Sequence, residues 1–419
     1  MFSRRDLLKH SLTTLTATAA GAAHAGRARV VVIGGGFAGA SAAIELRRID
    51  PGLRVTLIET NPTYYACPLS NMVVTRLRRI SQQAFGYTTL AASGIHVIHE
   101  RAEDVDPAIR KVKLASGATI SYDKLIMAPG IDLDWTALPG YNRVAAQSMP
   151  HAWKAGEQTL NLRDQLRSLP RGGLVVMSVP KAPYRCPPGP YERASLIASY
   201  LQRSNPRAKV LILDSKDNFS KQSLFQSAWQ ELYGDMIEWQ GESDGATVTS
   251  VDVKSRRLLT DFETVKADLA NIIPPQRAGA IAQAAGVTDA SGWCPIEPLS
   301  FSSTLQPDIH IIGDAAIANA MPKSAFAANA QARLCAVQVT RLLNSKPLIH
   351  SKLINTCYSL VAPDYGISIA GVYQPEPEIW AEIDGAGGVS PAVTSPEIRA
   401  LEATYAQSWF NNLTTEVFG

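Results

Sequence analysis

Short β-branched runs alternate with longer helical segments near the start of the chain. Residues 28–33 form a valine-rich apolar run that predicts a buried parallel strand. Residues 40–48 have helical composition, and residues 53–58 predict a second strand. A strand, a helix and a second strand in this order are typical of a βαβ unit. The pattern therefore predicts an α/β fold.

A glycine-rich turn joins the first predicted strand to the helix. Gly34, Gly36 and Gly39 give it the spacing GxGxxG. Such glycines permit a tight turn and let a pyrophosphate approach the backbone at the N-terminus of the helix. Glu59 ends the second strand and has a carboxylate able to accept ribose hydroxyls. The combination predicts a dinucleotide site; the alternative is an α/β fold whose glycines serve packing only.

A second fingerprint lies far along the chain. Residues 308–312 form a short apolar run that leads into Gly313 and Asp314. In flavoproteins with two dinucleotide-binding domains, an aspartate at this point holds the ribityl or phosphate end of the flavin. The two fingerprints together indicate FAD. They also require a discontinuous domain, and residues 122–130 resemble the strand that closes its first half.

The segment between the two fingerprints has a strand without a nucleotide turn. Residues 172–179 predict the strand, but Ser-Val-Pro follows where an NAD-binding domain has glycines. Pro180 and Pro183 have no N–H to donate to a phosphate. We expect a Rossmann-type domain that does not bind NAD, which argues against pyridine-nucleotide disulfide reductases and NADH dehydrogenases.

Residues 1–25 have the pattern of a removable twin-arginine export signal. Arg4 and Arg5 precede a stretch rich in alanine and threonine, and residues 23–25 have the small-x-small pattern of a cleavage site. The stretch is too short and too polar to span a bilayer, so we expect no membrane span. We expect a periplasmic protein; an ordinary basic N-terminal helix is the alternative.

Length and charge set the domain count and exclude one class of partner. The chain has 419 residues, enough for two or three domains, and 46% of them are hydrophobic. Lysine and arginine total 40 against 37 acidic residues, without the basic runs of nucleic-acid-binding tails. We expect no nucleic-acid partner. The predicted domains are an FAD-binding domain (26–145 and 271–345), a second Rossmann-like domain (146–270) and a C-terminal domain (346–419).

The five cysteines differ in their surroundings. Cys186 lies in a proline-rich loop, where Arg185 and a following helix N-terminus would favour its thiolate. Cys357 lies in the region that usually covers the flavin ring. The two either meet over the flavin, form a structural disulfide or are unrelated thiols. Cys67 follows the second strand and is either a site of thioether attachment to the flavin 8α carbon or a buried unreactive thiol.

The remaining cysteines and histidines indicate no metal site. Cys294 and Cys335 are interpreted as core residues, and Cys335 is expected within an alanine-rich helix that starts near Ser324. No cysteine or histidine pair has metal-ligand spacing, and the sequence has no CxxCH motif for covalent haem. Any haem is therefore expected on a partner.

Together these motifs resemble the flavoprotein subunit of flavocytochrome c sulfide dehydrogenase, a relative of sulfide:quinone oxidoreductase. The most specific segments are residues 64–71, 185–193, 271–279, 312–316 and 321–329. The resemblance implies a glutathione-reductase-like flavoprotein with two Rossmann-type domains and a C-terminal capping domain. It also implies FAD bound covalently to Cys67 through an 8α-S-cysteinyl bond.

The resemblance further implies a reaction and a partner. Cys186 and Cys357 would form a redox-active disulfide, with Glu192 beside it as an acid or base; a first-turn helix carboxylate is the alternative for Glu192. The implied activity is oxidation of sulfide, a small anionic substrate, to sulfur or polysulfide. Electrons would pass to a c-type cytochrome subunit in a heterodimer. A sulfide:quinone oxidoreductase and an accessory flavoprotein of a sulfur-oxidising complex are the alternatives.

Overall fold

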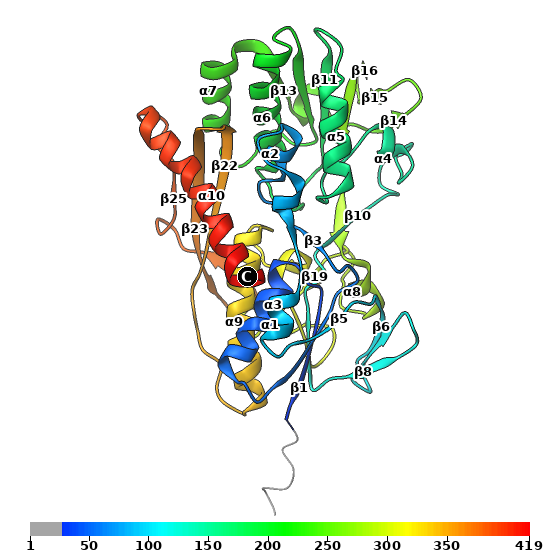
Figure 1. The fold of residues 1–419 in the computed structure, drawn as a ribbon, viewed down its shortest axis with the longest axis vertical. Helices are drawn as coiled ribbons and strands as arrows, with labels where there is room; N and C mark the ends of the chain where they lie inside the picture. Colours follow the sequence, from blue (N-terminus) through cyan, green and yellow to red (C-terminus); the bar gives the residue numbers. More distant parts are fainter. Residues whose placement is uncertain (1–26) are drawn as a thin grey trace, which may run out of the picture.

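A computed structural model describes residues 27–419, so the predicted export signal lies outside the described residues. Two α/β domains lie one above the other, and a third domain runs along one side of both (Figure 1). The first domain contains the blue and yellow segments, which are far apart in sequence. The predicted α/β architecture is confirmed.

The first domain has a five-stranded sheet in the order β20-β9-β1-β2-β5, with every neighbouring pair parallel. Its strands are β1 (Arg29–Ile33), β2 (Arg54–Ile58), β5 (His96–Ile98), β9 (Lys124–Met127) and β20 (Ile309–Ile311). The pairing of β20 with β9 joins the two distant parts of the chain in one sheet. Helix α1 (Phe37–Ile49) packs against α9 (Ala325–Leu343), which brings both fingerprints to the same edge.

Shorter elements surround this sheet. They are β3 (Tyr64–Tyr65), α2 (Ser70–Val74), β4 (Ala84–Phe85), α3 (Thr88–Ala92), β6 (Ala102–Asp106), β7 (Lys111–Leu114), β8 (Thr119–Ser121), β10 (Ile131–Leu133), β18 (Gln276–Ala278), α8 (Ala280–Ala284), β19 (Cys294–Pro295) and β21 (Ala316–Ile317). The antiparallel pair β10 and β18 forms the connection between the first two domains.

The second domain has a parallel four-stranded sheet in the order β13-β12-β11-β17. Its elements are α4 (Ala145–Ser148), α5 (Glu157–Arg167), β11 (Leu174–Val179), α6 (Gly189–Ser204), β12 (Lys209–Asp214), α7 (Gln222–Tyr233), β13 (Ile237–Gln240), β14 (Ser250–Asp252), β15 (Arg257–Leu259), β16 (Thr264–Lys266) and β17 (Leu269–Ile272). Because β17 pairs with β11, the predicted boundary at residue 271 falls inside a strand and belongs after Ile272.

The C-terminal domain is a small antiparallel sheet covered by one long helix. Its elements are β22 (Leu353–Ala362), β23 (Tyr365–Pro375), β24 (Trp380–Glu382), β25 (Gly388–Val389) and α10 (Pro396–Phe418). The hairpin of β22 and β23 lies beside α7 of the second domain, and α10 descends to α1 and α3 of the first (Figure 1). This domain therefore touches both of the others.

Candidate active site

A cavity of about 570 Å³ lies where the three domains meet. Its wall is built by the turn after β1, residues 64–71, the loop before α6, strand β22, and the facing sides of α9 and α10. Cavities of this size are typical of cofactor and small-molecule sites. Every site residue predicted from the sequence except Gly39 lines this cavity.

The glycine turn after β1 can be built only with glycines at two positions. Gly34 has φ +99°, and a Cβ there would lie 2.2 Å from the carbonyl oxygen of Ala128. A Cβ on Gly39 would lie 1.8 Å from the carbonyl oxygen of Gly34. Helix α1 therefore begins close against the turn, with its free N–H groups at the cavity. Gly36 is the residue that precedes the helix.

Glu59 lies beside this turn at the end of β2. Its carboxylate accepts hydrogen bonds from the backbone N–H of Gly35 at 2.8 Å and of Asn61 at 2.9 Å. The contacts hold the carboxylate at the cavity wall, in the position expected of a ribose-binding acid.

Asp314 carries an unsatisfied atom on the opposite wall. Within the described residues, its buried Oδ1 has no hydrogen-bond partner. Burial raises the pKa of Asp314. The preceding Gly313 has φ +73° and donates its N–H to Gln331 at 2.8 Å, which fixes the turn. Since buried polar atoms in proteins are normally paired, the orphaned carboxylate oxygen points to a ligand with a hydroxyl or N–H group.

Cys67 faces the same cavity from the segment between β3 and α2. Its Sγ lies 3.7 Å from the carbonyl oxygen of Trp153, which also accepts a hydrogen bond from the Arg185 guanidinium. The thiol is half-buried, and it shares the cavity with both fingerprints. The structure thus brings Cys67 to the site where its predicted attachment role requires it.

Cys186 projects into the cavity from the second domain. It has φ +56°, donates its N–H to the Lys323 carbonyl at 2.7 Å, and lies three residues before α6. A Cβ on Gly189 would lie only 3.1 Å from the Cys186 Sγ, so the sulfur rests directly on the first turn of the helix. The loop that holds a nucleotide in NAD-binding domains here presents a thiol instead.

The surroundings of Cys186 act on its thiol in both directions. The Cys186 side chain is exposed at the cavity, and desolvation by the surrounding protein atoms raises the pKa of its thiol. The carboxyl of Glu192 raises it further, and these effects outweigh the opposing effect of Arg185. Desolvation of a charge and a neighbouring carboxyl both disfavour the anion.

Cys357 reaches the cavity from β22 of the C-terminal domain. Its Sγ accepts a hydrogen bond from the Asn355 side chain at 3.3 Å. Cys186 and Cys357 are both free thiols in the structure. They line one cavity although they come from different domains and are 171 positions apart, since 357 − 186 = 171.

Glu192 connects the three domains through hydrogen bonds close to these thiols. It accepts a hydrogen bond from the Asn71 side chain at 2.8 Å and one from the backbone N–H of Leu360 at 3.3 Å. Burial raises the pKa of Glu192. It lies in the first turn of α6 and also lines the cavity, so both features expected from the sequence occur together.

Two buried cations at the site were not predicted. Arg193 donates to the Asn71 side chain at 2.9 Å and to the carbonyl of Ala152 at 2.6 Å, and burial lowers the pKa of Arg193 to about 10. It ends the proline-rich motif, which was the available signal. Lys221 donates to the Cys357 carbonyl at 2.7 Å. Nothing in the sequence marks it, because it is an isolated lysine.

In the second domain, the acidic residue at the end of β12 is buried and paired with other side chains. Asp214 ends β12, as Glu59 ends β2, but it is fully buried. Its carboxylate accepts hydrogen bonds from the Tyr191 hydroxyl at 2.6 Å, the Trp239 indole at 3.0 Å and the Lys216 ammonium. The Tyr191 ring is itself stacked on Phe219 at 3.6 Å. This acid is therefore unavailable to a ribose, as expected of a domain that does not bind NAD.

Three family models match the chain. Residues 159–274 match the central domain of the sulfide dehydrogenase [flavocytochrome c] flavoprotein chain, and residues 349–418 match the flavocytochrome c sulphide dehydrogenase flavin-binding domain. Residues 28–169 match the pyridine nucleotide-disulphide oxidoreductase model. The sulfide dehydrogenase [flavocytochrome c] flavoprotein chain of Chlorobaculum thiosulfatiphilum is 54% identical over 48 residues, which cover 12% of this chain and 100% of that sequence. The chain belongs to the flavocytochrome c sulfide dehydrogenase flavoprotein family.

More distant similarity connects this flavoprotein family to quinone-linked proteins. The mitochondrial sulfide:quinone oxidoreductase of Mus musculus is 21% identical over 307 residues, 68% of this chain but only 65% of its own length. The crystal structure of the Aquifex aeolicus sulfide:quinone oxidoreductase superposes with a TM-score of 0.73 at 18% identity, covering 93% of this chain and 92% of that one. These flavin-dependent oxidoreductases share the fold, so the predicted two-domain flavoprotein architecture is confirmed.

Two findings concern the part of the chain that the structure describes. No helix within residues 27–419 is both long and apolar enough to cross a membrane. The same residues contain no cluster of three or more histidine, cysteine, aspartate or glutamate side chains arranged to hold a metal ion.

Proposed function

We propose that this chain is an exported, periplasmic flavoprotein that oxidises sulfide to sulfur or polysulfide and passes the electrons to a c-type cytochrome subunit. The observation that carries the proposal is the shared cavity of Cys186, Cys357 and Cys67, which also contains both dinucleotide fingerprints. A thiol pair beside a flavin site is the arrangement needed to couple sulfur chemistry to a two-electron acceptor.

The residues of the cavity fit FAD. The glycine turn and the N-terminus of α1 would hold the pyrophosphate, Glu59 the ribose, and the unpaired carboxylate of Asp314 a hydroxyl of the ribityl chain. Cys67 would carry the flavin covalently. When bound, FAD supplies an acceptor that takes two electrons and releases them singly.

The chain's own groups supply the sulfur chemistry. Hydrosulfide attacks one sulfur of a Cys186–Cys357 disulfide; the new S–S bond makes that cysteine a persulfide, and the other leaves as a thiolate with the electron pair. Glu192 is suited to hold a proton beside Cys186, because burial raises the pKa of its carboxyl.

A chain of aromatic side chains supports a one-electron partner. Phe326, Tyr358 and Trp409 line the cavity and also a shallow groove on the outer side of α9 and α10. The Phe326 and Trp409 rings are stacked, with centroids 5.8 Å apart. A cytochrome seated on this groove would contact three aromatic side chains that also line the cavity, so we propose that the acceptor binds there.

An acceptor assay tests the proposal. We expect the purified holoprotein to oxidise sulfide when a c-type cytochrome is supplied, and to do so faster with its native haem subunit. The measurement is cytochrome reduction at a fixed sulfide concentration, with decylubiquinone in a parallel reaction. Reduction of the quinone alone would overturn the cytochrome assignment in favour of a sulfide:quinone oxidoreductase. No reduction of either acceptor would indicate an accessory flavoprotein.

The covalent link to Cys67 has its own test. After denaturation in acid, we expect FAD mass and yellow colour to remain on the peptide that contains Cys67, because a thioether survives unfolding. Replacement of Cys67 by alanine should release the FAD on denaturation, whereas Cys294→Ala, at a buried cysteine outside the cavity wall, should not. Free FAD from the unaltered protein would disprove the link.

A further inference from the structure

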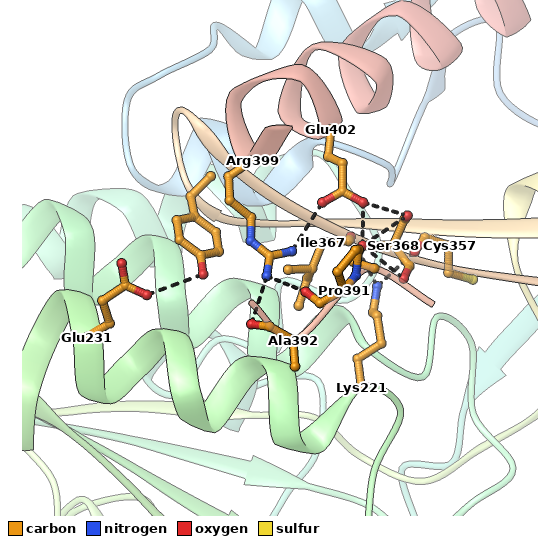
Figure 2. Close-up of polar contacts among 11 residues, drawn as sticks. Lys221, Glu231, Cys357, Ile367, Ser368, Pro391, Ala392, Arg399 and Glu402 are labelled. Carbon is orange, nitrogen blue, oxygen red and sulfur yellow. Dashed lines mark hydrogen bonds and ion pairs between the residues drawn. The ribbon is translucent and has the colours of Figure 1, made fainter. Parts of the chain in front are cut away.

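Lys221 is a buried lysine that has no part in the chemistry proposed above. It precedes α7, is 7% exposed, and has φ +62°, a backbone conformation that side chains other than glycine and asparagine rarely adopt. Its ammonium reaches the β22–β23 hairpin and donates to the Cys357 carbonyl at 2.7 Å (Figure 2). It also donates to the Ser359 hydroxyl at 2.9 Å. A buried charge and an unfavourable backbone conformation therefore occur together at Lys221.

The ammonium of Lys221 has only neutral oxygen partners. No carboxylate forms an ion pair with it in the part of the chain that the structure describes. Glu402 approaches the hairpin from α10, but its oxygens are occupied by Arg399 at 3.3 Å and by the hydroxyl groups of Ser368 and Ser390 (Figure 2). Burying a cation without a paired anion costs folding free energy. An anion that forms beside it during the reaction would offset this cost.

A thiolate at Cys357 would be such an anion. Side chains alternate along a strand, so Cys357 and Ser359 project from the same face of β22, where the Lys221 ammonium lies. Lys221 does not line the cavity, and its ammonium contacts the Cys357 carbonyl. It is therefore placed to act on the cysteine and not on the substrate.

The two cysteines have different charged residues near them. Cys186 lies beside the buried carboxyl of Glu192, which raises the pKa of Cys186 in the same direction as burial does. Burial lowers the pKa of Lys221 to about 8, and the neighbouring Cys357, Glu192, Cys186 and Glu402 oppose this shift. At neutral pH the ammonium is therefore charged. Tyr373 of β23 is the further titratable group that faces Cys357.

We propose that Lys221 is a positioning residue that makes Cys357 the thiolate when the disulfide opens, so that the persulfide forms on Cys186. The inference rests on the proposed function only in taking these two cysteines as the redox pair. The hydrosulfide sulfur bonds to the Cys186 Sγ and keeps its proton. The bond between the two Sγ atoms breaks, and its electron pair stays on Cys357 as the negative charge that Lys221 faces. A stabilised leaving thiolate departs faster.

Alkylation of Cys357 tests the inference without sulfide. The parent is the holoprotein with Cys186→Ser, in which Cys357 cannot form the disulfide, and the probe is iodoacetamide with peptide mass spectrometry. At pH 7, Lys221→Met should slow the reaction at Cys357 by about tenfold, because the thiolate is the reactive form and the variant removes a cation next to that residue. The deficit should shrink above pH 8, where Lys221 itself loses its proton. Lys221→Arg should restore the rate to within about threefold.

Two further variants separate charge from structure. Ser359→Ala removes a hydrogen-bond partner but keeps the ammonium, so its rate should stay within about twofold of the parent. Lys124→Met, at a lysine paired with Asp308 in the first domain, is the matched control and should change nothing at Cys357. Equal alkylation in the parent and Lys221→Met at every pH, a Ser359→Ala loss as large as that of Lys221→Met, or an unreactive Cys357 in the parent would each overturn the inference.

The outcome is independent of the acceptor assay. If sulfide is not oxidised but alkylation depends on Lys221, the proposed function fails and the electrostatic role of Lys221 stands. If sulfide is oxidised and alkylation does not depend on Lys221, only the inference about Lys221 fails.

Discussion

Replacement of Cys186 by serine is expected to lower the rate of sulfide oxidation by roughly a thousandfold or more, because a serine hydroxyl cannot form the disulfide that hydrosulfide attacks. Cys357→Ser should cause a loss of the same size, and the double variant should be no worse than either one. Residues that act as a unit are not additive. The measurement is the steady-state rate of cytochrome reduction at saturating sulfide, with FAD content checked by absorbance.

The matched control is Cys335→Ala. Cys335 is completely buried in α9 and does not line the cavity, so the folded variant should retain its rate. A second readout is the titre of thiols before and after reduction of the resting protein. We expect two additional thiols on reduction, located at Cys186 and Cys357. Full activity of either cysteine variant with FAD in place would refute the thiol mechanism.

Replacement of Gly39 by alanine is expected to abolish FAD loading or folding of the first domain. The added Cβ would lie 1.8 Å from the carbonyl oxygen of Gly34, and neither backbone segment can move without separating α1 from the glycine turn. We expect a loss of unfolding free energy of about 1–3 kcal/mol or more. Thermal unfolding and the ratio of flavin to protein absorbance measure the two effects.

Gly388→Ala provides the comparison for Gly39→Ala. Nothing lies within 4 Å of a Cβ built on Gly388, which is in the exposed edge strand β25. The same addition of one methyl group should therefore leave both FAD content and unfolding temperature unchanged. If Gly39→Ala bound FAD as well as Gly388→Ala does, the glycine turn would not be the pyrophosphate site.

Local patterns were enough to predict much of this fold. The strand predicted over residues 28–33 is β1, the one over 172–179 is β11, and the helix expected near Ser324 is α9 with Ser324 as its cap. These predictions succeed because buried parallel strands are continuous apolar runs and helix starts have recognisable caps. The predicted boundary at residue 271 missed the end of β17 because strand pairing, unlike composition, depends on a distant partner.

The electrostatics of the site were predicted less well. Arg185 next to Cys186 in sequence suggested a stabilised thiolate, but its guanidinium is directed to the Trp153 carbonyl while Glu192 lies beside the sulfur. The cation nearest the Cys357 backbone is Lys221, which donates to the Cys357 carbonyl and is distant in sequence from every recognised motif. Sequence neighbours were thus a poor guide to the groups that surround each thiol.

The sequence by itself determined the βαβ start, the two fingerprints, the absence of a nucleotide turn in the second domain and the three candidate cysteines, because each depends on residues close together in the chain. Tertiary structure alone decided that Cys67, Cys186 and Cys357 share one cavity, that Glu192 lies near Cys186, and that the Lys221 ammonium contacts the Cys357 carbonyl. The physical reason is that burial and charge at a thiol are sums over neighbours from all three domains. Those neighbours are known only once the domains are packed.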